Sequence, residues 1–238
     1  MTADAPIGIV AGSGIELETL LSEQTAARSF DEIPGLSETA IAGHAGRIVE
    51  GRCGVVPIVI QSGRLHFYEG HDAASVTACV DVLHAMGART ILYTNAAGGL
   101  AGDMAAGDLM AVTEVACWPY GGWSARPTAA VPTDFVLRAC DRRGRYTWVH
   151  GPCYETRAEI AALQSLRTDA VGMSTAPELQ RCRELGIQAG AVSCITNTCG
   201  VPEVLTHARV LETAQHSSER LRGLIRGWLR EAPREVHV

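Results

Sequence analysis

Apolar residues gather along the chain in two patterns, short crowded runs and longer stretches with helical spacing. Strand-like runs cover residues 6–10, 46–60, 90–94, 108–115, 146–149, 169–173 and 187–195. The run from Val55 to Ile60 is crowded with β-branched side chains, which is typical of a buried strand. Helical stretches separate many of these runs. The alternation predicts an α/β fold around a central sheet.

The helical stretches have recognisable starts. Residues 71–88 keep apolar side chains at helical spacing. Thr156 and Glu159 form a capping box, so a helix is predicted to begin there. Pro177 marks the start of another helix. The C-terminal helix carries an apolar stripe over residues 210–228, which predicts packing on the sheet rather than on a membrane.

Polar and soft side chains follow the ends of two strand-like runs. Glu155 lies on the turn after residues 146–149, and Met173, Ser174 and Thr175 end the run at 169–173. In open α/β sheets, ligands gather at the carboxyl ends of strands. A single turn carboxylate is usually solvated, but four such side chains at two strand ends predict a ligand site.

Two glycine-rich turns also follow strand-like runs. Gly12 and Gly14 flank Ser13 before a helix-like stretch, an order that suits an anion site at a helix N-terminus. A plain tight turn is the more common interpretation of such a pattern. The small residues of NAAGGL at 95–100 let the backbone approach a ligand closely, and Asn95 is expected to organise that loop.

The segment SGRLHFYEGHD places Arg64, His66 and Tyr68 at alternate positions. If the segment is extended, all three side chains point to the same side. A solvated edge strand accounts for any one of them more easily than for the set. The set favours an anion site beside a hydroxyl group.

Composition narrows the class of ligand. The chain has 238 residues, enough for one large α/β domain or two small ones. A formal net charge of -6 and a pI near 5.7 argue against nucleic acid as a partner. The sequence contains no Lys, so a bound phosphate would have to meet Arg, a helix N-terminus or backbone amides.

The cysteines and the apolar runs indicate the cellular setting. The eight Cys are scattered without a CxxC pair, so neither a zinc site nor a disulfide framework is predicted. No signal peptide pattern precedes the first strand, and no apolar run is long enough to span a membrane. We expect a reduced, cytoplasmic protein.

Six motifs, in order and spacing, resemble the trimeric class of purine nucleoside phosphorylases. They are GSG, GRLHFYEGH, TNAAGGL, GPCYETRAE, DAVGMSTAPE and ITN. The second, fourth and fifth motifs are specific, whereas the glycine turns alone are not. The resemblance implies a single domain over residues 1–238, with a mixed, twisted central sheet flanked by helices. It also implies a homotrimer with sites near the subunit boundaries.

The resemblance assigns roles to individual positions. It implies a phosphate cradle of Ser13, Arg64, His66, Ala96 and Ser174. It implies ribose contacts from Tyr68, Met173 and His207, and purine contacts from Tyr154, Glu155 and Asn197. Asn197, His66 and Glu155 would be the catalytic residues. Inorganic phosphate is the implied co-substrate, with no cofactor and no metal.

Several of these residues also have ordinary structural interpretations. His207 could cap the last helix, His66 could be a structural hydrogen-bonding residue, and Met173 could fill the core. Two departures from the family pattern stand out. The irregular segment 116–145 is shorter than in the family, where it supplies an aromatic lid to the neighbouring subunit, and Tyr120 and Trp123 are its candidates here. Asn197 is followed by Thr-Cys.

Three functions fit this pattern. The first is phosphorolysis of 6-oxopurine nucleosides such as inosine and guanosine, because an ionised Glu155 can accept the N1 hydrogen that adenine lacks. The second is cleavage of 5′-methylthio nucleosides. His207 argues against it, because a donor facing a thioether would lose roughly 1–3 kcal/mol. The third is a silent nucleoside binder, which would not need a phosphate cradle.

Overall fold

The structure is a computed structural model that describes residues 5–37, 45–118, 131–201 and 206–231. Tyr120 and Trp123, the candidates for an aromatic lid, lie outside the described residues.

In the described chain, the strands are β1 (Ile7–Ala11), β2 (Glu23–Ser29), β3 (Arg47–Cys53), β4 (Val56–Ser62), β5 (Thr90–Gly99), β6 (Leu109–Cys117), β7 (Val131–Pro132), β8 (Arg142–Trp148), β9 (Ala170–Gly172) and β10 (Gln188–Thr198). The α-helices are α1 (Ala73–Ala85), α2 (Arg157–Ser165), α3 (Ala176–Glu184) and α4 (His207–Glu231), and they follow β4, β8, β9 and β10, respectively. Short 3-10 turns cover Glu18–Leu20, Phe30–Glu32 and Phe67–Glu69. The predicted α/β class is confirmed.

The strands form one mixed sheet that closes partly on itself. From the edge inward, β2, β3 and β4 pair antiparallel, and β4 continues through β1 to β5 in parallel. The long β5 then pairs with both β9 and β10. Since β10 joins β6, β6 joins β8 and β8 joins β9, these strands complete a ring. The ring brings the ends of β5, β9 and β10 together.

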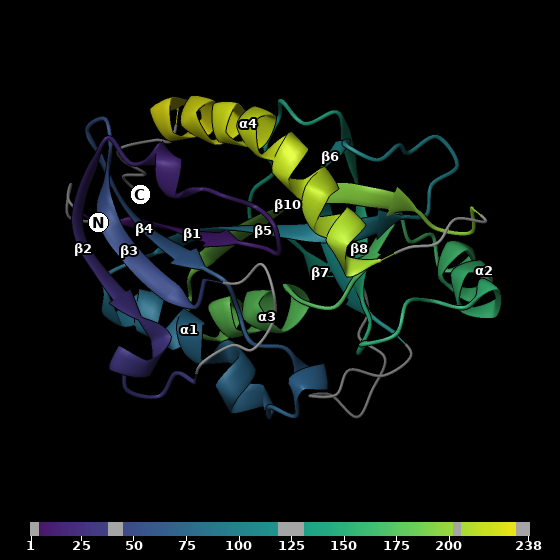
Figure 1. The fold of residues 1–238 in the computed structure, drawn as a ribbon, viewed down its shortest axis with the longest axis horizontal. Coiled ribbons are helices and arrows are strands. Elements are labelled where there is room, and N and C mark those ends of the chain that lie inside the picture. Colours follow the sequence, from purple (N-terminus) through teal and green to yellow (C-terminus); the bar gives the residue numbers. More distant parts are fainter. Residues whose placement is uncertain (1–4, 38–44, 119–130, 202–205, 232–238) are drawn as a thin grey trace.

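Helices cover both faces of the sheet. α4 runs along one face, and α1 and α3 lie on the other (Figure 1). Alternate residues of β5 reflect this: Ile91 and Tyr93 pack in the cluster with α1 and α3, whereas Leu92 packs with Leu221 and Ile225 of α4. The predicted apolar stripe of the C-terminal helix is therefore confirmed as a surface that packs on the sheet.

The helix predicted after Gly14 is wrong. Residues 15–17 are not helical, and only the 3-10 turn Glu18–Leu20 precedes β2. Ile15 and Leu17 are both buried, two positions apart, so their spacing is not that of a helix face. Glu18 is bound by Arg47 Nε at 2.7 Å and by the Ser62 hydroxyl at 2.7 Å. These long-range contacts outweigh local helix propensity.

The loop predicted at 95–100 is also wrong. β5 continues through Gly99, because β10 runs beside it as far as Thr198 and β9 pairs with Gly98 and Gly99 on its other side. Small residues here therefore form a strand, and they still permit a close approach of other groups.

Candidate active site

One cavity of about 100 Å³ lies where β1, β5, β9 and β10 end. The residues to which the resemblance assigns roles all line it: Ser13, Arg64, His66, Tyr68, Ala96, Tyr154, Glu155, Met173, Ser174, Asn197 and His207. Thr175, which was also predicted to face a ligand at the end of its strand, does not line it. Residues distant in sequence therefore meet as the motifs predicted. Their individual roles stay predictions.

Arg64 supplies a buried cation at the floor of this cavity, with only 2% of its surface exposed. Its Nη2 donates to the Thr94 carbonyl at 2.9 Å, and its Nη1 donates to the Ser174 hydroxyl at 2.7 Å. The Glu178 carboxylate lies 3.7 Å from Nη1. Because the guanidinium is fixed by several acceptors, its position is set before any ligand arrives.

Ser174 is fixed through its backbone. The hydroxyl of Tyr146, a fully buried residue of β8, donates to the Ser174 carbonyl at 2.9 Å. Burial raises the pKa of Tyr146, so this hydroxyl stays protonated and remains a donor. The Ser174 side chain is left to face Arg64 and the cavity.

His66 lies beside Arg64 in a largely buried position. Burial lowers the pKa of His66, and Arg64 lowers it further, while Glu69 acts in the opposite direction. Glu69 Oε2 lies 3.2 Å from the Nδ1 atom and accepts the His66 backbone N–H at 2.7 Å. A neutral ring with Nδ1–H directed at Glu69 leaves Nε2 to act as an acceptor. The neighbouring Tyr68 ring stacks on it at 4.8 Å.

The condition that the segment from Arg64 to Tyr68 is extended holds only in part. His66 is extended, but Tyr68 belongs to a 3-10 turn for which His66 is the N-cap. Tyr68 still lines the cavity, because the stacking holds its ring against the imidazole. Burial raises the pKa of Tyr68 to about 12, which keeps the phenol protonated.

A β-bulge aims Asn197 at the cavity. The register between β5 and β10 shifts between Ile195 and Asn197, so Thr196 is an extra residue. In a regular strand, Asn197 would project from the same face as the buried Ile195, which lies two positions earlier; bulges re-aim side chains. The Thr196 hydroxyl lies 3.1 Å from Asn197 Oδ1 and can donate to it. Asn197 Nδ2 donates one hydrogen to Cys199 Sγ at 3.9 Å, and its second hydrogen can donate to a ligand.

Glu155 is positioned by the helix that follows it. The capping box of Thr156 and Glu159 is confirmed, with the Thr156 N–H donating to Glu159 at 2.7 Å. Burial raises the pKa of Glu155, and the nearby Glu159 carboxylate adds to the effect. Tyr154 lies at the rim and is 43% exposed. The site thus presents a half-buried acceptor near the donor of Asn197.

Close packing shapes the wall between these groups. Gly151 has a φ of 77°, and a side chain there would collide with Met173 and Tyr68. Gly12 has a similar function at the opposite end, where a Cβ would lie 2.7 Å from the Asn95 Cα. His207 and Val210, from the first turn of α4, close another side of the cavity.

Sequence reasoning did not single out Glu69, Glu178 or Thr196. Glu69 and Glu178 each follow a site residue by three positions, and each accepts that residue's backbone N–H at 2.7 Å. The spacing of a residue and a Glu three positions later is a capping signal that is visible in the sequence. Thr196 gives no such signal, because its effect depends on the register of two distant strands.

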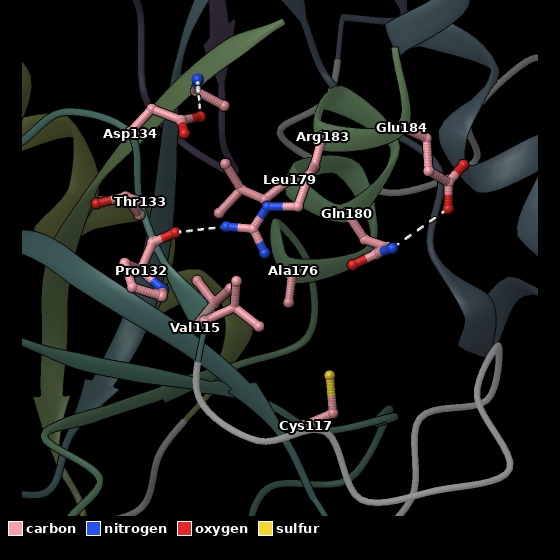
Figure 2. A pocket seen from close by; sticks show the side chains of 12 residues that line it. Val115, Cys117, Pro132, Thr133, Asp134, Ala176, Leu179, Gln180, Arg183 and Glu184 are labelled. Carbon is pink, nitrogen blue, oxygen red and sulfur yellow. Dashed lines mark hydrogen bonds between the residues drawn. The ribbon is translucent and has the colours of Figure 1, made fainter. Parts of the chain in front are cut away.

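A second cavity, of about 330 Å³, lies between α3, β6 and β7. Figure 2 shows Arg183 between Leu179 and Pro132, with its guanidinium donating to the Pro132 carbonyl at 2.8 Å. None of the predicted site residues lines this cavity.

Among the described residues, no group of three or more His, Cys, Asp and Glu side chains is arranged to hold a metal ion. None of the described helices has both the length and the apolar character needed to cross a bilayer.

The mixed sheet and the cavity that holds Arg64, Glu155 and Asn197 define a phosphorylase-type α/β fold. Comparison with known proteins agrees. The family described as "Phosphorylase superfamily" matches residues 6–230, and the chain belongs to this family. Within it, the relatives are purine nucleoside phosphorylases, which confirms the resemblance.

Purine nucleoside phosphorylase 1 of Bacillus subtilis is 32% identical over 88% of this chain and 86% of its own length. The Mycobacterium tuberculosis purine nucleoside phosphorylase is 35% identical over 92% of this chain and 87% of its own. A solved structure of Schistosoma mansoni purine nucleoside phosphorylase in complex with inosine superposes with a TM-score of 0.84 at 27% identity. It covers 98% of this chain and 93% of that chain.

Proposed function

We propose that the protein cleaves 6-oxopurine ribonucleosides and deoxyribonucleosides, such as inosine and guanosine, with inorganic phosphate. The products are the free purine and ribose or deoxyribose 1-phosphate. The observation that carries this proposal is the convergence in one cavity of a donor set, Arg64 with Ser174, and a base-reading pair, Glu155 with Asn197. A binding protein for nucleosides alone would have no use for the donor set.

In the proposed reaction, a phosphate oxygen forms a bond to C1′ as the bond from C1′ to N9 breaks. The electron pair of that bond leaves with the purine, which becomes anionic while the sugar carries positive charge. Arg64, Ser13, His66, Ser174 and the Ala96 amide would hold the phosphate beneath the sugar. Asn197 Nδ2 would donate to N7 or O6 of the departing base. Catalysis would come from positioning and electrostatic stabilisation, with no covalent enzyme intermediate.

Glu155 supports selection of 6-oxopurines. An ionised carboxylate only accepts hydrogen bonds, and hypoxanthine and guanine offer it the N1 hydrogen. Adenine presents a bare lone pair there, so the two acceptors would face each other. The inosine-bound schistosomal relative agrees with this choice of base. Unpaired buried polar groups discriminate by about 10⁴-fold or more.

Steady-state kinetics with inosine, adenosine and 5′-methylthioinosine, with and without phosphate, tests the proposal. We expect phosphate-dependent cleavage of inosine and a kcat/KM for adenosine about 10⁴-fold lower. The Asn197→Asp variant should lose inosine turnover and gain some adenosine cleavage, because a carboxylate at this position can accept from a 6-amino group. Equal efficiency with adenosine and inosine would contradict the proposal. A preference for methylthioinosine would instead favour the second function, although His207, which lines the cavity, argues against it.

A further inference from the structure

Thr175 occupies a strained position directly behind the cavity. Its φ is 74° and its ψ is -48°, and the Ala176 N–H donates back to the Ser174 carbonyl at 2.9 Å. This is a γ-turn with positive φ, which is rare and strained for any residue with a side chain. Thr175 is also β-branched and has no exposed surface. The surroundings must therefore hold this conformation.

The Glu178 carboxylate holds the turn. The Thr175 N–H donates to Glu178 Oε2 at 2.7 Å, and Glu178 itself is buried, with 2% of the residue exposed. The same carboxylate lies 3.7 Å from Arg64. Glu178 thus joins the strained backbone to the cation of the site.

The hydroxyl of Thr175 has both of its acceptor positions occupied. Arg64 Nη1 donates to it at 3.0 Å, and Asn95 Nδ2 donates to it at 2.9 Å. A hydroxyl oxygen accepts two hydrogen bonds and donates one. The remaining neighbour is the Ser174 hydroxyl at 3.3 Å, so the Thr175 proton is directed there.

The consequence appears at Ser174. Its oxygen accepts from Arg64 at 2.7 Å and from Thr175, which occupies both of its acceptor positions. Its own proton is left to point into the cavity that Ser174 lines. Ser174 is thereby fixed as a donor, the polarity that an oxyanion requires.

We propose that Thr175 is a positioning residue for the anion: its hydroxyl orders the hydrogen bonds among Asn95, Arg64 and Ser174 so that Ser174 donates to phosphate. This inference rests on the proposed function, because the anion is taken to be the phosphate co-substrate. On this inference, the strained turn places the Thr175 hydroxyl, and its role is not limited to the path of the backbone.

Three substitutions at Thr175 separate the effect of its hydroxyl on phosphate binding from the effect of backbone strain. Thr175→Val keeps the shape and removes the hydroxyl; Thr175→Ser keeps the hydroxyl. Thr175→Gly removes the hydroxyl but tolerates the positive φ. The matched control is Thr168→Val, since Thr168 is a buried threonine that is bonded to Thr147 at 2.8 Å and does not line the cavity.

The measurements are the KM values for phosphate and inosine, and calorimetric titration of the protein with inorganic phosphate alone. We expect Thr175→Val and Thr175→Gly to weaken phosphate binding about tenfold to 100-fold, the effect of losing a hydrogen bond to a charged group. The KM for inosine should change less than about twofold on the same scale. Thr175→Ser and Thr168→Val should resemble the wild type.

Unchanged phosphate affinity in Thr175→Val, or rescue by Thr175→Gly, would overturn the inference. Equal weakening of phosphate and inosine by Thr175→Val would also overturn it, because that outcome indicates general damage to the fold. If the wild type binds phosphate but does not cleave inosine, the proposed function fails, and the titrations still decide the role of Thr175.

Discussion

At the scale of single residues, the proposed phosphate cradle depends on the buried guanidinium of Arg64, which several groups of the protein hold in place. Arg64 donates to a carbonyl and to hydroxyls, and Glu178 offsets its charge. Removing either Arg64 or Glu178 from this buried pair should destabilise the protein. Breaking a buried ion pair costs about 3–5 kcal/mol, because the remaining charge is left uncompensated.

Substituting Arg64 tests this arrangement. Arg64→Ala should reduce kcat/KM for phosphate by about 10²–10³, since it removes a charge-assisted donor aimed at the anion. Arg64→Lys should recover only part of the loss, because an ammonium cannot reproduce the fork. Urea unfolding of Arg64→Ala should show the cost of the unpaired Glu178, and adding Glu178→Gln should reduce it. Normal phosphate saturation in both single variants would exclude Arg64 from the cradle.

The ionised Glu155 carboxylate should lower the stability of the folded protein, although it is proposed to recognise the purine base. Burial raises its pKa in the folded state, so its contribution to stability is present below the ordinary value of 4.5 and is lost as pH rises through the raised pKa. Glu155→Gln should therefore raise the melting temperature at neutral pH, and the gain should vanish as pH falls toward 4.5.

Glu155→Gln should also reduce the selectivity for 6-oxopurines over adenine, because an amide both donates and accepts hydrogen bonds. Inosine efficiency should fall and adenosine efficiency should rise. In the wild type, inosine cleavage should decline on the acid side at a higher pH than an ordinary glutamate would give. A variant with unaltered stability at neutral pH and unaltered selectivity would contradict both roles.

At the scale of secondary structure, the sequence predicted elements with local signals and missed those that depend on distant partners. The helix at α2 was predicted from Thr156 and Glu159, and the strand at β4 from its crowded apolar residues. β2 was missed because its residues are mostly exposed and polar, and only pairing with β3 makes it a strand. The prediction of a helix after Gly14 was wrong for the same reason, because distant residues determine the structure of this segment.

The site shows the same division. The residues to which the motifs assign roles line the cavity, but how they are held was not predictable. The bulge at Thr196 requires the register of β5 and β10, and the strain at Thr175 requires the buried Glu178. Local spacing identifies which residues a site contains, whereas their orientation comes from tertiary contacts.

The cap of α2 offers a test at this scale. Thr156→Ala removes a capping hydroxyl and should cost about 1 kcal/mol of stability. Because the cap adjoins Glu155, the KM for inosine should also rise. Asp72→Ala is the matched control, since Asp72 caps α1 through Ser75 at 2.8 Å and α1 contributes no residue to the cavity. Equal stability losses with equal effects on KM would show that the cap does not position Glu155.

At the scale of the whole molecule, we propose a homotrimer in which neighbouring subunits complete the sites. The support is the resemblance of the motifs to the trimeric class and the position of Tyr154, a half-exposed aromatic side chain at the cavity rim. Light scattering should give the mass of three chains of 25.2 kDa. A fully active monomer would contradict a shared site. That residues 1–238 form a single domain also stays a prediction.

The central claim is that phosphate is consumed in cleaving a 6-oxopurine nucleoside. Phosphorus NMR of the protein incubated with inosine and inorganic phosphate tests this most directly. We predict that the inorganic phosphate signal falls as a ribose 1-phosphate signal grows, with one hypoxanthine released for each phosphate consumed. Hypoxanthine released without loss of inorganic phosphate, or no cleavage at all, would contradict the account.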